Sequence, residues 1–329
     1  LSGADKERLA KNYTQNTEAY QLYLRGRFYW NKRTIKDLRK SIDYFQQAIT
    51  VDQDYALAYA GLSDSYSILS FFGGGAPREL MPKARDAALK ALSLDDQLSE
   101  AHAALAQVLS NYDYDHAAAE LELKRAIQLN PNYPSAHQFY GWLLTRQGRH
   151  EDAAVELQRA LELDPFSLII NKFYGDSFLY ARRYDEALTQ LKKAVELDGN
   201  FAATHASLGI VYQLKGDYAA SVEEYAKFLE LSDFMEFAAI IRKDFTRGGW
   251  EAFLKAISGE QRPPSLSAQL AAAAFFTALG ENDKALADLN KIYEDRGTYA
   301  GHIKVDPRLD PLRNDPRFKD LLKRLNLPE

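Results

Sequence analysis

Residues 134–165, PSAHQFYGWLLTRQGRHEDAAVELQRALELDP, decide the fold, because two later segments align with them without a gap. These are residues 168–199, LIINKFYGDSFLYARRYDEALTQLKKAVELDG, and residues 202–233, AATHASLGIVYQLKGDYAASVEEYAKFLELSD. A small residue near the middle of the first half recurs at intervals of 34 residues, as Gly141, Gly175 and Gly209. A fixed period of this length, with a turn in the middle and a breaker at the end, is typical of stacked helix pairs.

The same pattern extends in both directions from this regular block. We predict six repeats over residues 19–233, preceded by a helical extension at residues 1–18. Residues 234–264 match the pattern least well and are interpreted as a degenerate repeat or hinge. Residues 265–329 are predicted to contain a last repeat and a C-terminal cap. A stack of repeats needs such a cap to cover its final apolar face.

Two departures from the period carry predictions of their own. The second repeat contains an insertion at residues 70–83, where three glycines and a proline predict an irregular loop. Near the end of the chain, Asp-Pro occurs three times, at Asp306, Asp310 and Asp315, and each pair predicts a capped helix start. A final helix is expected near residues 316–325.

Composition excludes several classes of protein. The 329 residues carry a net charge of −5, whereas nucleic-acid binders normally present a basic face, so we expect no nucleic-acid partner. The absence of cysteine excludes disulfides and thiolate metal sites. No apolar run is long enough for a membrane span, so no membrane insertion is expected. The chain begins with Leu, which we interpret as a piece of a longer protein.

The repeats resemble those of tetratricopeptide repeat (TPR) proteins over almost the whole chain. The resemblance implies an all-α fold, a TPR-type α-solenoid. It would form a right-handed superhelix of about eight antiparallel helix pairs with a C-terminal capping helix. The stretches EAYQLYLRGRFYWNKRT (18–34) and VDPRLDPLRNDPRF (305–318) also resemble TPR segments of bacterial signalling proteins. In those proteins a eukaryotic-like Ser/Thr kinase or a winged-helix DNA-binding domain precedes the array.

Catalytic and metal chemistry find little support in the residues. His102, His137 and His205 occupy the same place in three repeats, about one repeat width apart, which is too far to share a zinc ion. We interpret them as helix-packing residues. The acidic pairs fall on polar faces or in turns, and no kinase or phosphate-loop motif occurs. We therefore expect no enzyme activity, no cofactor and no metal.

The resemblance also implies a binding surface, because the first helix of each TPR pair lines a concave groove. Mapping the groove positions onto this chain gives the predicted partner-binding residues Tyr23, Arg27, Gln138, Trp142, Arg146, Lys172, Asp176 and Tyr180. Trp, Tyr and Arg often anchor protein interfaces. The alternative is that these aromatic residues pack against the neighbouring repeat. The TPR clamp for chaperone C-termini requires Lys and Asn where this chain has Tyr23 and Arg27, so that ligand is not expected.

We therefore expect a non-catalytic scaffold that binds a protein or peptide in its groove, as the docking or sensing part of a bacterial signalling protein. The alternative is a sensor that binds a small ligand or peptide and relays it to an attached effector. The sequence assigns no oligomeric state. A cytoplasmic location is expected, or an extracytoplasmic one if a membrane span precedes the segment.

Overall fold

The computed structural model describes residues 14–259 and 269–327 and divides the chain into two compact units, Leu1–Pro131 and Asn132–Glu329. Helices are the regular secondary structure of the described residues, which contain no strand, so the fold is an all-α solenoid of the TPR type. Part of the N-terminal extension and the Pro263-Pro264 break lie outside the described residues, as does the start of the last repeat.

Unit 1 consists of helices that follow the predicted repeats one, two and three. They are α2 (Thr17–Asn31), α3 (Ile35–Val51), α4 (Ala56–Phe71), α5 (Pro77–Leu94), α6 (Ser99–Val108), the π-helical turn η1 (Leu109–Asp113) and α7 (His116–Leu129). Asn16 and Thr34 cap α2 and α3 by accepting bonds from first-turn backbone N–H groups.

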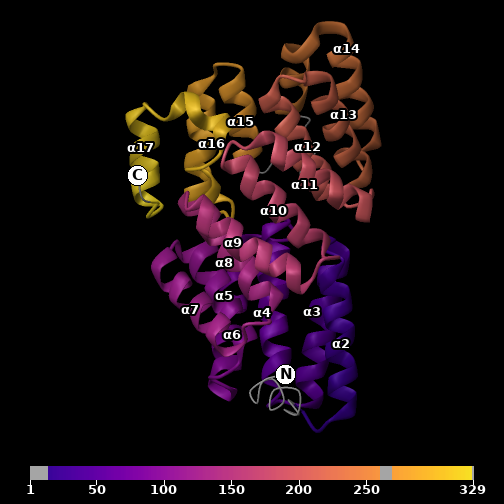
Figure 1. The fold of residues 1–329 in the computed structure, drawn as a ribbon, viewed down its shortest axis with the longest axis vertical. Helices are drawn as coiled ribbons and strands as arrows, with labels where there is room; N and C mark the ends of the chain where they lie inside the picture. The colour runs from indigo at the N-terminus through magenta and orange to yellow at the C-terminus, as the bar shows by residue number, and fades with distance from the viewer. Residues whose placement is uncertain (1–13, 260–268, 328–329) are drawn as a thin grey trace. The chain divides into compact units, whose positions relative to one another are not determined.

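Unit 2 begins with the three regular repeats and ends with shorter elements. Its helices are α8 (Pro134–Gln147), α9 (His150–Leu163), α10 (Leu168–Tyr180), α11 (Tyr184–Leu197), α12 (Ala202–Lys215), α13 (Tyr218–Leu231), α14 (Met235–Ser258), α15 (Gln269–Ala278), α16 (Asn282–Glu294), the 3₁₀ turns η3 (Ala300–His302) and η4 (Pro307–Leu312), and α17 (Pro316–Arg324). Consecutive helices form antiparallel hairpins (Figure 1). The expected final helix is present as α17.

Close approach of the two helices explains the recurring glycine. A Cβ atom on Gly141 would lie 2.5 Å from Leu157 Cγ and 3.1 Å from the Ala153 carbonyl oxygen. Leu157 is fully buried in the partner helix α9. Burying such a leucine contributes about 1.5–3 kcal/mol. The period of 34 residues therefore preserves a contact between a small residue and a large one in each hairpin.

The structure of the insertion at residues 70–83 differs from the irregular loop that the sequence predicts. The expected irregular loop is confined to the short connection after Phe71, and α5 already begins at Pro77. Pro77 stands in the first turn of α5, where its missing N–H costs nothing. Pro82 lies inside the helix, in its second turn. Most of the extra residues therefore lengthen the hairpin.

The glycine pair in the degenerate region breaks α14 into two parts. Gly248 and Gly249 have non-helical backbone angles, with φ +65° at Gly249, a conformation that favours glycine.

Of the three Asp-Pro pairs, those at Asp306 and Asp315 begin helices as predicted, because the Asp side chains cap η4 and α17. The middle pair, Asp310-Pro311, does not begin a helix as predicted, because both residues lie inside η4.

In the part of the chain that the structure describes, no helix has both the length and the apolar character that a membrane span requires.

Candidate functional site

Most of the predicted partner-binding side chains lie on two neighbouring helices of unit 2. Within each helix they are four residues apart, a spacing that places side chains on one side of a helix. The six residues, from α8 and then α10, are Gln138, Trp142, Arg146, Lys172, Asp176 and Tyr180. The two helices contact each other, and the ring centroids of Trp142 and Tyr180 are 5.9 Å apart. We call the surface formed by these six residues the α8–α10 face.

Charges on the α8–α10 face are largely removed from solvent. Lys172 and Asp176 form an ion pair one turn apart on α10, and their side chains are only 14% and 4% exposed. Arg146 is fully buried, and desolvation lowers the pKa of its guanidinium to about 10. Arg146 therefore stays protonated at neutral pH, at a desolvation cost that the surrounding structure must offset.

A segment from the C-terminal part of the chain covers this face. Within residues 299–309, called the 299–309 segment below, the ring of His302 lies 4.9 Å from that of Trp142 and 5.7 Å from that of Tyr180. Val305 packs in the same apolar cluster as Trp142 and Tyr180. The Lys304 ammonium donates to the carbonyl of Gln147, at the end of α8, at 3.3 Å.

The expectation that Trp142 is exposed in an open groove is therefore wrong. Trp142 is 5% exposed, Arg146 2% and Tyr180 7%. Two neighbours account for the burial of Trp142, since it stacks on Phe173 of the next repeat at 4.3 Å and lies beneath His302. The alternative considered from the sequence, packing against the neighbouring repeat, describes part of this arrangement.

The 299–309 segment carries its own buried ion pair. Arg308 donates from Nε to Asp306 Oδ1 at 3.0 Å and from a terminal nitrogen to Oδ2 at 2.6 Å. The side chains are 5% and 0% exposed. Arg308 also interacts with Tyr225 of α13, whose pKa burial raises to about 12. The pair places a satisfied charge beside the aromatic residues of unit 2.

His302 has an unusual electrostatic environment. It is 1% exposed, and burial holds its pKa well below the ordinary value. The charges of Arg146, Lys172 and Arg308 lower that pKa further, against a smaller opposite effect from the bond that Nδ1 donates to the Tyr299 carbonyl. The imidazole is therefore neutral at physiological pH and acts as a flat, weakly polar ring against Trp142.

The remaining two predicted residues, Tyr23 and Arg27, belong to unit 1 and are half-buried. The ring of Tyr23 lies 5.4 Å from that of Tyr55. The guanidinium of Arg27 lies 4.1 Å from the ring centroid of Trp30 and 3.7 Å from Asp64 Oδ2. Both residues thus take part in the packing of the first two repeats.

Asp64 is the strongly perturbed acid of unit 1. It is 2% exposed, and burial raises its pKa to about 7, although the charges of Arg27 and Arg33 lower it. Its Oδ1 has no hydrogen-bond partner among the described residues. Isolated burial of a carboxylate favours the protonated form.

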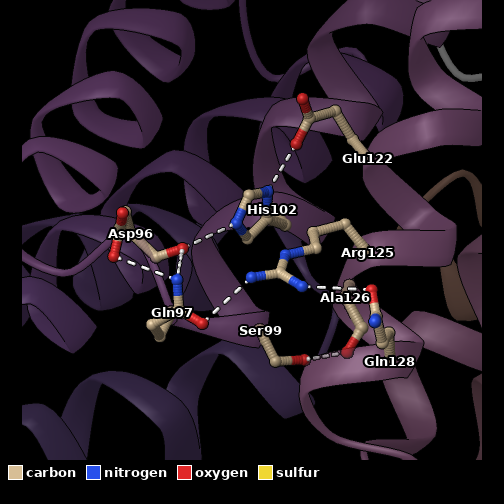
Figure 2. A network of polar contacts seen from close by, with 8 residues as sticks. All are labelled: Asp96, Gln97, Ser99, His102, Glu122, Arg125, Ala126 and Gln128. Atoms are coloured by element: carbon tan, nitrogen blue, oxygen red, sulfur yellow. Dashed lines mark hydrogen bonds and ion pairs between the residues drawn. The ribbon is translucent and has the colours of Figure 1, made fainter.

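The three aligned histidines each pair with a glutamate of the following helix. His102 donates from Nε2 to the Asp96 carbonyl at 3.0 Å and faces Glu122 through Nδ1 at 2.5 Å (Figure 2). His137–Glu156 and His205–Glu224 repeat the Nδ1 contact at 2.6 Å. Each histidine therefore ties the two helices of its own repeat together. The described residues contain no group of three or more histidines, cysteines or acids arranged to hold a metal.

The fifth repeat makes the same connection without charge. Asn171 stands where its neighbours have histidine, donates to the Pro165 carbonyl at 3.0 Å and accepts from Gln190 at 2.8 Å. An imidazole that faces both a carbonyl and a carboxylate, as those of His102 and His205 do, donates from both nitrogens and is charged. The Asn171–Gln190 pair makes its connection with neutral groups.

The residues of the 299–309 segment were not predicted from the sequence to belong to the site. The missing residues are Gly301, His302, Val305, Asp306 and Arg308. One signal was present, because Ile303, Val305 and Leu309 are apolar in a stretch with no helical period. Apolar residues of this kind are expected to be buried, but their pattern in the sequence does not predict which helices they pack against.

Comparisons with known proteins agree with the repeat pattern. A model described as tetratricopeptide repeat matches residues 111–169, and one described as TPR repeat matches residues 175–216. Among curated proteins, the transcriptional regulator HilA of Salmonella typhimurium is 26% identical over 135 residues, which is 41% of this chain. The chain spans about a quarter of HilA, 24% of its length.

Solved structures show a similar fold at low sequence identity. A monomeric mutant of IFIT1 with m7Gppp-AAAA has a TM-score of 0.58 and 17% identity, covering 88% of this chain and 67% of that chain. The human IFIT1 dimer with PPP-AAAA has a TM-score of 0.56 and 19% identity, covering 86% and 70%. At such identities the likeness concerns the fold alone. Residues 111–169 and 175–216 therefore match tetratricopeptide repeats, in agreement with the helix pairs described above.

Proposed function

We propose that this chain is a non-catalytic protein-interaction module that binds an extended protein or peptide segment on the α8–α10 face. The residues of this face are those that the TPR resemblance assigns to a concave groove. The partner would contact Gln138, Trp142 and Tyr180 together with the charged residues of the face. Tyr23 and Arg27 would provide a second contact region in unit 1.

One observation carries the proposal. The α8–α10 face already holds a stretch of polypeptide that is not part of any repeat hairpin, the 299–309 segment, through a ring contact on Trp142 and an aliphatic contact at Val305. A surface that accommodates one irregular segment has the shape and chemistry to hold another. Tryptophan, tyrosine and arginine are also the side chains that most often dominate binding energy.

We further propose that the module serves a larger bacterial signalling or regulatory protein. The similarity to part of HilA, a transcriptional regulator, supports this context. A polypeptide partner is favoured over a nucleic acid because the chain has a net charge of −5, whereas nucleic-acid binding relies on neutralising phosphates. The cations of the α8–α10 face are buried or paired with acids, so they are not presented to phosphate groups, which also favours a polypeptide partner.

Affinity capture from a lysate of the source organism tests the proposal. The informative variant combines Lys172→Ala with Asp176→Ala, because removing both members of an ion pair leaves no buried charge behind. The matched control combines Lys192→Ala with Glu196→Ala, two exposed residues one turn apart on the second helix α11. We expect the α10 variant to lose a captured protein that the α11 variant retains. Equal capture by both variants would exclude the α8–α10 face as the binding surface.

A further inference from the structure

We propose that the 299–309 segment is an internal ligand of the α8–α10 face, and that the partner of this face is a peptide of the same chemistry that displaces it. The inference rests on the proposed function and adds to it both the kind of partner and the way binding is regulated. The partner would present a flat ring, an aliphatic side chain three residues later, and an acidic and a basic residue that pair with each other.

The first support is that the segment satisfies its own backbone. The N–H groups of Ala300, His302, Ile303 and Val305 donate to the carbonyls of Gly297, Tyr299, Ala300 and His302, respectively. The last three of these bonds lie within the segment, build η3 and its continuation, and move with the segment when it leaves. Departure therefore does not require breaking a ladder of backbone bonds between the segment and α8 or α10.

The second support is that the segment carries both members of its buried ion pair. Asp306 and Arg308 are two residues apart and bond to each other through two contacts. Breaking a buried pair by removing one partner is strongly destabilising, because the remaining charge is left uncompensated. Here both charges leave together and become hydrated together, so release leaves neither charge uncompensated, although it also breaks the contact between Arg308 and Tyr225 of α13.

The third support concerns the contact surface itself. His302 and Val305 bind mainly through rings and methyl groups, on Trp142 and Tyr180. Such contacts are non-directional, and another peptide with a ring and an aliphatic residue at the same spacing can replace them. On the receiving side, both members of the Lys172–Asp176 ion pair belong to α10, so this pair remains when the segment leaves.

The position of Gly301 beside Arg146 indicates how to separate the segment from the face. A Cβ atom on Gly301 would lie 2.7 Å from Arg146 Cδ and 3.2–3.3 Å from two of its guanidinium nitrogens. Arg146 is fully buried and has little room to move. Gly301→Val therefore should push the segment away from the face while leaving α8 and α10 unchanged in sequence.

The experiment measures binding of a fluorescent peptide with the sequence of residues 298–311 to the full chain. The wild-type segment is tethered, with an effective concentration on the order of millimolar, so added peptide at micromolar concentration competes poorly. We expect the Gly301→Val chain to bind the peptide at least about tenfold more tightly than wild type does. Gly199→Val is the matched control, because only one atom lies within 4 Å of a Cβ there, at 3.8 Å. It should bind as wild type does.

Hydrogen exchange provides the second readout and needs no variant. In the wild-type chain, amides of residues 300–309 should exchange at least about tenfold faster than the central amides of α10, because a displaceable segment opens without global unfolding. Equal exchange rates would mean that the segment opens only with the whole unit, and would overturn the inference. Because hydrogen exchange is measured on the wild-type chain, it tests the inference even if the Gly301→Val variant does not fold.

The remaining outcomes separate the inference from the proposed function. A captured partner that needs Lys172 and Asp176 but leaves the exchange of residues 300–309 unchanged supports the function and refutes the internal ligand. A Gly301→Val chain whose segment exchanges freely but binds no peptide also refutes it. If that chain instead dimerises by exchanging segments, the occupant is a second copy, and the proposed partner class is wrong.

Discussion

The imidazole of His302 lies 4.9 Å from the indole of Trp142, although the two residues come from opposite ends of unit 2. Trp142 belongs to the most regular repeat of the chain, and His302 to a short turn with no repeat pattern. The contact explains why a residue at a groove position is buried. It also makes the C-terminal segment part of the candidate site.

The recurring glycine should not tolerate even one methyl group. Alanine is favoured over glycine in a helix interior by about 1 kcal/mol, so propensity alone predicts that Gly141→Ala stabilises the chain. We expect the opposite, a loss of about 1–3 kcal/mol, because the new Cβ overlaps Leu157 and approaches a backbone oxygen that cannot move aside. Urea unfolding followed by circular dichroism measures the difference. Gly199→Ala, whose Cβ would make only one ordinary contact at 3.8 Å, should change stability by less than about 0.5 kcal/mol.

Stability should fall at alkaline pH through the histidine pairs. Desolvation lowers the pKa of His205, but the hydrogen bonds to Glu224 and to the Gly199 carbonyl, with the charge of Glu224, raise it by more. A raised folded-state pKa gives stability that is fully present below the unfolded value of 6.5 and is lost as pH rises through the folded value. The free energy of unfolding should therefore decrease as pH rises above about 6.5.

The fifth repeat supplies the control for this pH dependence. His205→Asn with Glu224→Gln copies the neutral Asn171–Gln190 pair and should flatten the pH profile. The reverse exchange, Asn171→His with Gln190→Glu, should steepen it. Identical slopes in all three chains would mean that these pairs do not set the pH dependence.

The buried ion pair of the 299–309 segment should be sensitive to loss of one member. Asp306→Asn leaves Arg308 without a carboxylate in a buried site and should cost about 3–5 kcal/mol of unfolding free energy. Combining it with Arg308→Met should restore part of that loss. Asp310 in the same region is half-exposed, pairs with Arg313 and Arg182, and provides the comparison, since Asp310→Asn should cost less than about 1 kcal/mol. Similar losses for the two asparagine variants would contradict the burial argument.

Asp64 predicts a second pH effect, this one in unit 1. Burial raises its pKa from 3.8 to about 7, so between these values the folded chain keeps a proton that the unfolded chain has lost. Stability therefore decreases as pH rises through this interval. Asp64→Asn mimics the protonated acid and should be more stable than wild type above pH 7, with little difference near pH 4. Urea midpoints across this range measure the effect, and Asp43→Asn, on an exposed residue of α3, should leave the wild-type profile unchanged.

The hairpins of the regular block could be predicted because their contacts are local and periodic. Gly141 meets Leu157 within one repeat, and the same spacing recurs 34 residues later at Gly175 and Leu191. Six of the eight proposed partner-binding residues also lie together on α8 and α10, because residues four apart share one side of a helix. The boundaries of the insertion could not be predicted as well from the sequence. Pro77 and Pro82 indicate a break in a helix, but both lie in the first two turns of α5.

By itself, the sequence determined the all-α solenoid, the helix pairs and the side of each first helix that carries the unusual side chains. The physical reason is that each repeat packs against the repeats next to it in the chain. The residues that make these contacts therefore recur in the sequence at a fixed period. Only the tertiary structure decided that His302 and Val305 cover Trp142 and Tyr180. That contact joins distant segments through non-directional apolar packing, which leaves no spacing or motif in the sequence to identify the two surfaces.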